Sequence, residues 1–345
     1  MTKPWFLIPA AWAHSLSPWV LPIYSRLQKD FIAQDPKKFL WRPLVWKGLN
    51  FRNPLGIAGG VDKNADNILD WLRLGIGFAE VGTITPMPQT ANPGIIMDRD
   101  LATQSLWNKM GFPNEGCEEI LYNLLEIKSD LQKNRAPLFV NIGKNRSTSN
   151  EEAIKDYIFC VQKLSVVADV FVINISSPNT QGLRQLQHAE VLQKLLRDMV
   201  LYKQNHKITQ PLLLKLSPDM GESDFQQTLQ IAVQEGIDGF ILTNTTLQRE
   251  KDSPFPAEGG VSGEPLQKLS LKYLELANKV LDPVRRDVLL VSVGGVLTPQ
   301  QALDRLNAGA DLVQTYSGLI FYGPDFFISA ARKAKVNEFG NKIPS

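Results

Sequence analysis

Residues 170–180 read VFVINISSPNT, and this stretch carries the pattern that decides the fold. Its first half is apolar without the polar alternation of a half-exposed strand, which predicts a strand buried on both faces. Seven other runs follow the same plan: each is apolar, ends in glycine, asparagine, lysine, serine or threonine, and usually precedes a helical pattern. The eight runs cover residues 54–60, 78–83, 137–143, 170–177, 211–217, 239–245, 288–295 and 312–318. Eight such units predict an α/β fold, a (β/α)8 TIM barrel whose chemistry lies at the C-terminal ends of its strands.

Helical periodicity fills the intervals between these strands. The predicted helices cover residues 65–74, 114–127, 150–164, 188–205, 222–235, 265–281, 298–308 and 324–336. A small hairpin is expected at residues 44–53, so we divide the chain into a helical extension, residues 1–43, and a barrel, residues 44–345. Residues 86–113 are too many for an ordinary strand-to-helix loop, and their buried-type aromatic residues argue against disorder. They predict a lid over the site, and residues 247–262 form a second long excursion.

Composition excludes several classes of protein. The chain has 345 residues, 43% of them hydrophobic, which is enough for one large barrel. A net charge of +2 without a long basic run argues against a nucleic-acid partner. Its two cysteines, Cys117 and Cys160, suit a reducing compartment rather than a disulfide framework. The three histidines do not cluster with cysteine or carboxylate at metal-ligand spacing, so we expect no metal.

The amino-terminal segment is apolar but interrupted. Residues 4–25 contain no Asp, Glu, Lys or Arg, yet four prolines make a single membrane-spanning helix a poor fit. Ser17 and Pro18 resemble an N-cap and a first helical position, and the apolar residues after them share one helical face. We predict two short amphipathic helices. They either lie in a membrane interface or cap the barrel or another subunit, and the residues alone do not separate these alternatives.

Glycine pairs end the last two predicted strands and follow the sixth. Gly294-Gly295, Ser317-Gly318 and Gly259-Gly260 with Gly263 suit phosphate binding through backbone N–H groups, although single glycine pairs also serve ordinary turns. Together they favour a phosphate-bearing cofactor, because barrels commonly bind phosphate in this region.

Amide and lysine side chains end other predicted strands. Asn141, Asn174 and Asn244 occupy equivalent positions, which predicts amides converging on a planar polar ligand. Lys63 and Lys215 either form structural ion pairs or face a cofactor ring or a substrate carboxylate. We favour function for Lys215, the one charge on its strand. Ser177, before a proline, is either a turn hydroxyl or a proton acceptor activated by its surroundings, since no histidine partner is visible.

At this point the chain resembles the dihydroorotate dehydrogenases, specifically the membrane-associated, quinone-using class 2. The matching motifs are short, but their order and spacing are specific. They are residues 53–56 (NPLG), 62–64 (DKN), 81–83 (VGT), 108–112 (NKMGF), 141–145 (NIGKN), 174–180 (NISSPNT), 182–184 (GLR), 215–219 (KLSPD), 243–246 (TNTT), 259–260 (GG), 262–263 (SG), 294–295 (GG) and 316–318 (YSG).

The resemblance implies FMN-dependent oxidation of dihydroorotate to orotate, a step of pyrimidine (UMP) biosynthesis. Ser177 would be the catalytic base that distinguishes class 2, since class 1 has cysteine there. The residues implied to bind the cofactor FMN are Gly59, Gly60, Lys63, Thr83, Asn141, Asn174, Lys215, Thr243, Gly263, Gly295, Tyr316 and Ser317. Those implied to bind the substrate are Lys63, Asn108, Lys109, Met110, Gly111, Phe112, Asn174, Asn179, Asn244 and Thr245.

Class 2 members carry an amino-terminal helical pair that forms a quinone tunnel at the membrane. The resemblance therefore favours membrane association for the first 40 residues, with His14 and Arg99 as quinone contacts and a peripheral place on the cytoplasmic side of the cell inner membrane. Small departures from the family pattern fall at Gly59, Gln181 and Pro113, near the core contacts. The competing interpretations are a class 1 enzyme, a dihydrouridine synthase, which needs a basic RNA-binding face, and a barrel without catalysis.

Overall fold

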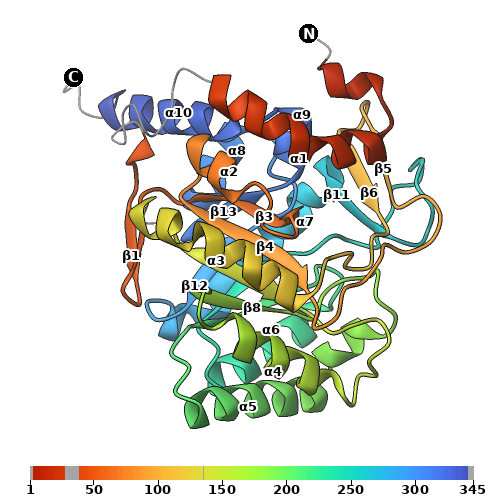
Figure 1. The fold of residues 1–345 in the computed structure, drawn as a ribbon, viewed down its shortest axis with the longest axis vertical. Helices are drawn as coiled ribbons and strands as arrows, with labels where there is room; N and C mark the ends of the chain where they lie inside the picture. Colours follow the sequence, from red (N-terminus) through yellow and green to blue (C-terminus); the bar gives the residue numbers. More distant parts are fainter. Residues whose placement is uncertain (1–2, 28–38, 135, 341–345) are drawn as a thin grey trace.

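The computed structural model describes residues 3–27, 39–134 and 136–340, and its centre is a closed barrel of eight parallel strands (Figure 1). The strands are β3 (Leu55–Asp62), β4 (Phe78–Ile84), β7 (Leu138–Ile142), β8 (Val170–Asn174), β9 (Leu212–Leu216), β10 (Gly239–Leu242), β12 (Leu289–Ser292) and β13 (Leu312–Thr315). Each neighbour in the ring is hydrogen-bonded in parallel register, and β13 closes on β3. Every strand falls on one of the eight predicted runs, so the predicted fold class is confirmed.

Strand residues alternate between two apolar layers. On β8, Val170 and Val172 point into the barrel, whereas Phe171 and Ile173 pack outward against the helices. The barrel floor is closed by the predicted hairpin, β1 (Leu44–Trp46) and β2 (Leu49–Phe51), which pairs antiparallel. Phe51 of this hairpin packs edge-on against Phe78 and Phe139. Because the floor is filled, ligands reach the barrel from the opposite, C-terminal end.

The outer ring contains the predicted helices with small changes at their ends. They are α2 (Ile68–Arg73), α3 (Cys117–Asn134), α4 (Ala153–Leu164), α5 (Ala189–Asn205), α6 (Glu222–Gln234), α7 (Glu264–Leu281), α8 (Pro299–Asn307) and α10 (Phe326–Gly340), with 3-10 turns η3 (Leu183–Gln187) and η4 (Asp282–Val284). A short helix that was not predicted, α9 (Ser317–Phe321), begins at residues that the sequence assigned to the end of the last strand. The predicted start of α2 at residue 65 is wrong. Ala65 has a φ of 66°, outside the helical region, and the Asp62 carboxylate accepts the backbone N–H groups of Asp66 and Asn67 instead.

The two long excursions meet over one end of the barrel. Residues 86–113 contain a hairpin, β5 (Met97–Asp100) with β6 (Ser105–Asn108), and β11 (Gly260–Gly263) of the second excursion pairs antiparallel with β6. The resulting three-stranded sheet lies beside α1 (Figure 1). Residues 86–113 are therefore an ordered cover, as predicted, although its opening as a lid stays a prediction.

The amino-terminal segment differs from the prediction. It contains a 3-10 turn, η1 (Pro4–Leu7), and one helix, α1 (Ala10–Leu27), that runs straight through Ser17 and Pro18. The predicted helix start at Ser17 is wrong because both interior prolines are compensated. The His14 carbonyl, which lacks an N–H partner at Pro18, accepts the Ser17 hydroxyl at 2.8 Å. The Pro18 carbonyl, four residues before Pro22, accepts the Asn67 amide at 3.1 Å.

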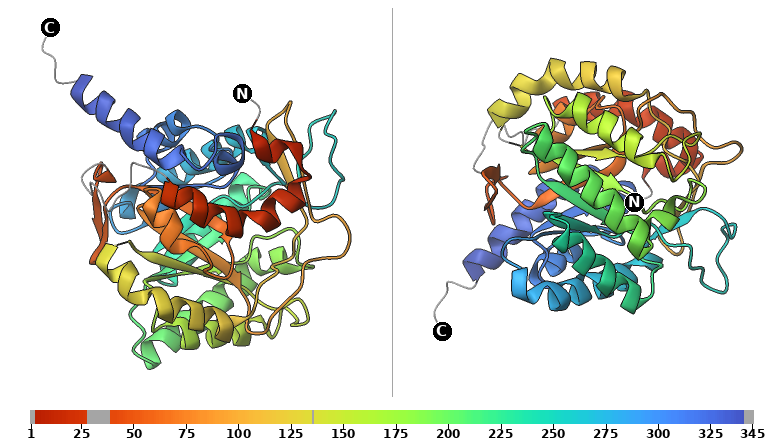
Figure 2. Two further views of the ribbon diagram at one scale, coloured as in Figure 1. Left: turned by 45° about the horizontal axis from the view of Figure 1, so that its top comes forward. Right: turned by 90° about the horizontal axis from the view of Figure 1, so that it is seen from below.

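Helix α1 docks on the barrel by one side only. It crosses α2 and β5, whereas α10 projects beyond the barrel body (Figure 2). In the described residues no helix has both the length and the apolar character needed to cross a membrane. Residues 28–38, where the second predicted amino-terminal helix would lie, are outside the described residues.

Candidate active site

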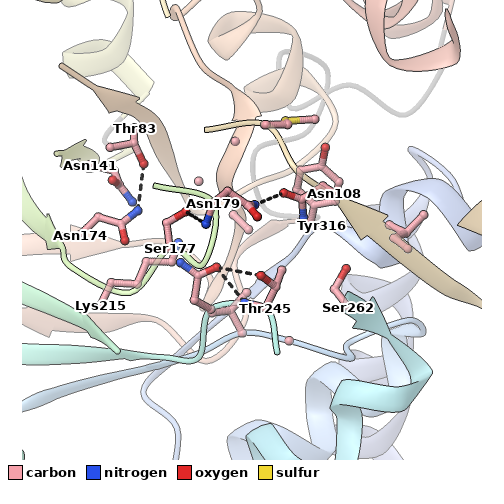
Figure 3. A pocket seen from close by; sticks show the side chains of 18 of the residues that line it. Thr83, Asn108, Asn141, Asn174, Ser177, Asn179, Lys215, Thr245, Ser262 and Tyr316 are labelled. Carbon is pink, nitrogen blue, oxygen red and sulfur yellow. Dashed lines mark hydrogen bonds between the residues drawn. The ribbon is translucent and has the colours of Figure 1, made fainter. Parts of the chain in front are cut away.

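A cavity lies at the C-terminal ends of the barrel strands, where the sequence predicted the site. Its empty volume is about 1020 Å³, including its open mouth. Asn174, Ser177 and Lys215, which end or follow two neighbouring strands, all line it (Figure 3). The other predicted ligands that line it are Gly59, Gly60, Lys63, Thr83, Asn108, Met110, Gly111, Phe112, Asn141, Asn179, Thr243, Asn244, Thr245, Gly295, Tyr316 and Ser317.

The amides at the strand ends are held by one another and by hydroxyl groups. Asn174 donates to the Thr83 hydroxyl at 2.9 Å, while its oxygen accepts the backbone N–H and hydroxyl of Ser176. Asn244 donates to the Ser176 hydroxyl at 2.9 Å, so Ser176 links two of the predicted ligands from behind. Such interlocked groups are preorganised, because each has its orientation fixed before a ligand arrives.

Lys215 is held by a residue that the sequence analysis missed. Glu80, in the middle of β4 and fully buried, lies 2.8 Å from the Lys215 ammonium. The same carboxylate accepts the Asn141 amide and the Gln314 amide, each at 2.6 Å. A charged residue inside the apolar run of residues 78–83 was the available signal. Both alternatives for Lys215 are thus partly met, since it is ion-paired and also lines the cavity.

Among the described residues, two buried amide oxygens in the cavity wall have no protein partner. They are Oδ1 of Asn141 and Oδ1 of Asn179, whose Nδ2 groups are engaged by Glu80 and by Asn108. A buried acceptor without a donor is unfavourable by about 1–3 kcal/mol, so these positions call for a ligand that carries N–H or O–H groups. A flavin ring and a dihydropyrimidine both offer N–H donors, and the residues therefore fit both groups.

The opposite end of the cavity is rich in backbone N–H groups. Gly294-Gly295 follow β12, and Gly295 has a φ of 69° that favours glycine. A Cβ atom on Gly295 would lie 2.3 Å from the Cα atom of Gln267, so the turn packs directly on the first turns of α7. Ser262 and Ser317, whose hydroxyls are 3.3 Å apart, line the cavity beside this turn. A helix N-terminus with glycine and serine is the chemistry that binds phosphate.

Ser177 stands in a dry part of the site. Its side chain is 5% exposed, and its hydroxyl oxygen accepts the backbone N–H of Asn179 at 3.2 Å. A donor to the oxygen, rather than an acceptor for the proton, stabilises the negative charge that develops when a serine hydroxyl loses its proton. Ser177 was predicted to be either a turn hydroxyl or a proton acceptor. The turn contact is present, and the position of Ser177 in the cavity wall is also compatible with accepting a proton from a ligand.

Lys63 connects this cavity to the amino-terminal helix. Its ammonium lies 2.7 Å from Nε2 of His14 on α1. Burial lowers the pKa of Lys63 to about 8, against the opposing effect of Asp62 and Asp66. Burial, and secondarily the Lys63 charge, lower the pKa of His14 to about 3, so the imidazole stays neutral and accepts the lysine proton. The structural-pair alternative for Lys63, with Asp62 or Asp66, is not the contact found among the described residues.

A second, apolar cavity lies under α1. Its empty volume is about 1370 Å³ including its open mouth, and both predicted quinone contacts, His14 and Arg99, line it. Arg99 donates to the carbonyls of Trp5 and Ile8 and so fastens the segment around η1. The wall between the two cavities is thin: Met97, Leu106 and Tyr316 line both.

Two predicted ligands lie outside the cavity wall. Lys109 pairs with Glu258 at 2.7 Å and does not line the cavity, so its role as a substrate contact stays a prediction. Asn108 and Met110 on either side of it line the cavity, whereas the Lys109 ammonium is directed to Glu258 of the second excursion. Gly263 is also absent from the wall, where its neighbour Ser262 stands; it caps the first turn of α7 instead.

Comparisons with known proteins agree with this geometry. A family model described as dihydroorotate dehydrogenase matches residues 44–335. The dihydroorotate dehydrogenase (quinone) of Idiomarina loihiensis is 38% identical over 316 residues, 90% of each chain, and that of Acinetobacter baylyi is 41% identical over 292 residues, 82% of this chain and 85% of the other. The solved structure of the Eimeria tenella enzyme in complex with ferulenol superposes with a TM-score of 0.84 at 30% identity, covering 96% of this chain and 92% of that one.

Proposed function

The chain belongs to the dihydroorotate dehydrogenase family and is an oxidoreductase of its quinone type; we propose that it oxidises dihydroorotate to orotate with FMN as hydride acceptor and a membrane quinone as final electron acceptor, in pyrimidine (UMP) biosynthesis. The observation that carries the proposal is the convergence of Asn174, Ser177 and Lys215 on one cavity. The adjoining apolar cavity gives a second substrate its own entrance.

FMN would occupy the barrel end of the first cavity. When bound, it supplies the acceptor for two electrons and a hydrogen. The unpartnered oxygen of Asn141 and the ammonium of Lys215 would face its ring, and the lysine charge would stabilise the reduced form. The phosphate would bind where Gly295, Ser317 and the first turn of α7 present N–H and hydroxyl groups.

Dihydroorotate would bind on the side of the cavity that holds Lys63 and the strand-end amides. Lys63 would pair with the substrate carboxylate, and a charged partner of this kind contributes more than a neutral donor. Asn179 would use its unpartnered oxygen for a ring N–H group, while Asn108 is fixed by its amide. Asn244 is likewise fixed, by Ser176.

Ser177 would remove the substrate proton that accompanies hydride loss. The hydroxyl proton of Ser177 would pass to water, and the N–H group of Asn179 would stabilise the alkoxide that then takes the substrate proton. General-base catalysis of this kind contributes about 10²–10⁴-fold to a rate.

Quinone would enter the apolar cavity beneath α1 from a membrane surface. The outward side of α1 carries Trp12, Trp19, Ile23 and Leu27, each more than 60% exposed. An aromatic and aliphatic face of this kind suits the membrane interface. We place the protein as a peripheral protein on the cytoplasmic side of the cell inner membrane.

The test is an anaerobic rapid-mixing experiment on the flavin-loaded protein. Ser177→Ala should retain bound FMN but slow flavin reduction by dihydroorotate by about 10²–10⁴-fold, while reoxidation by quinone keeps its rate. Ser177→Cys, which restores an ionisable group at the same place, should recover part of the loss. Reduction at the unaltered rate in Ser177→Ala would remove this residue from the chemistry, and a protein that binds no flavin would refute the proposed function.

A further inference from the structure

The Glu80 carboxylate is the centre of a buried polar layer across the barrel. Donors from three other strands converge on it: Lys215 of β9, Asn141 of β7 and Gln314 of β13. All four side chains are buried, and Glu80 and Gln314 are completely so. The carboxylate thus accepts one ammonium and two amide donors, each from a different strand.

Filling a barrel interior with charged and amide side chains costs more free energy than filling it with apolar ones. Immediately below this polar layer the interior is packed with Phe78, Phe139 and Val172, which need no partners. Replacing a buried ion pair by well-packed apolar residues is often neutral or stabilising, so stability alone does not account for Glu80 and Lys215. Their position is the informative feature, because the layer forms the floor of the first cavity.

Glu80 reaches the cavity only through its partners. It does not line the cavity, whereas Lys215 and Asn141 do, and both bond the same oxygen, Oε1. Gly59, which also lines the cavity, allows this approach: a Cβ atom there would lie 2.2 Å from Oε1. The absence of a side chain at Gly59, one of the departures from the family pattern, thus leaves room for the carboxylate.

We propose that Glu80 is a positioning residue for the flavin site, which fixes the Lys215 ammonium and the Asn141 amide and keeps Lys215 charged both before and after flavin reduction. The inference rests on the proposed function, since it assigns Lys215 to the flavin. Lys63, which directly follows β3, is the other charged side chain in the cavity wall, and its contact is with His14 rather than Glu80.

The physical consequence is a change in proton uptake. With Glu80 in place, the carboxylate pairs with the Lys215 ammonium at 2.8 Å, and reduction of a bound flavin would leave this pair unchanged. Without the carboxylate, Lys215 is an unpaired buried ammonium and loses its proton to water. Lys215 would take a proton back from water when the bound flavin is reduced, because the added negative charge favours the ammonium. Reduction of the bound flavin by two electrons is then coupled to one additional proton. Its equilibrium constant gains a tenfold dependence on each pH unit, which corresponds to about 30 mV per pH unit in the reduction potential.

The experiment measures the reduction potential of the bound flavin between pH 6 and pH 7.5, where Lys63 keeps its proton. In Glu80→Gln the flavin reduction equilibrium should change about tenfold more per pH unit than in the wild type. This added slope should vanish in Glu80→Gln/Lys215→Met. Glu118→Gln, which removes the same charge from the exposed pair with Lys163, is the matched control and should match the wild type. A wild-type slope in Glu80→Gln, or an added slope that persists in the double variant, would overturn the inference.

A second measurement covers the case in which Glu80→Gln fails to fold. Lys215→Met alone leaves an unpaired carboxylate under the flavin, so adding Glu80→Gln should raise its FMN occupancy, read from the flavin absorbance, at least tenfold. A double variant that holds no more FMN than Lys215→Met would overturn the inference. Because wild-type FMN binding is measured alongside, failure of the proposed function would be seen separately as a colourless wild-type protein.

Discussion

Acidification should release α1 from the barrel, because His14 is held in an environment that resists protonation. Docked His14 has a pKa lowered to about 3, first by burial and then by Lys63, against an ordinary value of 6.5. The docked helix therefore binds fewer protons than the released one between these values, and docking weakens as pH falls below 6.5. Each pH unit is worth about 1.4 kcal/mol, so lowering the pH to 5 should weaken docking by about 2 kcal/mol, or about 30-fold.

Hydrogen exchange measured by mass spectrometry tests this expectation. Protection of the amides of α1, corrected for the intrinsic pH dependence of exchange, should fall about 30-fold between pH 7.5 and pH 5, while α4, on another side of the barrel, keeps its protection. His14→Gln retains an acceptor for Lys63 without a titrating ring and should lose the pH dependence. Equal protection at both pH values, or the same loss in His14→Gln, would refute the assignment to His14.

Two further predictions concern substrate and membrane. Because the pKa of Lys63 is lowered to about 8, its charge is lost as pH rises. Orotate binding, followed by the flavin spectrum, should therefore be about tenfold weaker at pH 9 than at pH 7. Lys63→Met should bind orotate weakly at both pH values, and a pH dependence that survives in this variant would mean that another group causes it. Trp19→Ser and Ile23→Ser, at side chains 77% and 61% exposed, should each weaken binding to anionic lipid vesicles about tenfold without altering flavin reduction. Val45→Ser, at a side chain 69% exposed on β1, is the matched control and should bind vesicles as the wild type does. Vesicle binding that is unaltered in all three variants would contradict the placement of α1 at the membrane.

The barrel could be predicted from the sequence because its information is local. Each strand is a short apolar run with its own polar ending, and the rule that parallel strands share one functional end places those endings together. Asn174, Ser177 and Lys215 were found this way. Lys109, predicted as one of the continuous contacts of residues 108–112, does not line the cavity, because its ammonium pairs with Glu258, a partner 149 positions away that no local pattern indicates.

What the sequence did not reveal depends on contacts between distant residues. Glu80 meets Gln314 across 234 positions, and no local pattern pairs them. The helix start at Ser17 was mispredicted for the same reason: the carbonyl left open by Pro22 is satisfied by Asn67, 49 residues from Pro18. Local rules treat Pro as a helix boundary, and a long-range donor removes the cost on which that rule depends.

The contact between His14 and Lys63 links α1, which lines the apolar cavity, to a residue of the polar cavity. His14 lines the apolar cavity, Lys63 lines the polar one, and their nitrogen atoms are 2.7 Å apart. Release of α1 therefore opens the wall of the apolar cavity and also exposes Lys63 to water, which returns its pKa toward the ordinary value. The opening of the apolar cavity and the exposure of Lys63 have one cause, which is the release of α1. Orotate binding and the hydrogen-exchange protection of α1 should therefore weaken together as pH falls from 7.5 to 5. If α1 were only an attachment to a surface, its release would leave orotate binding unchanged.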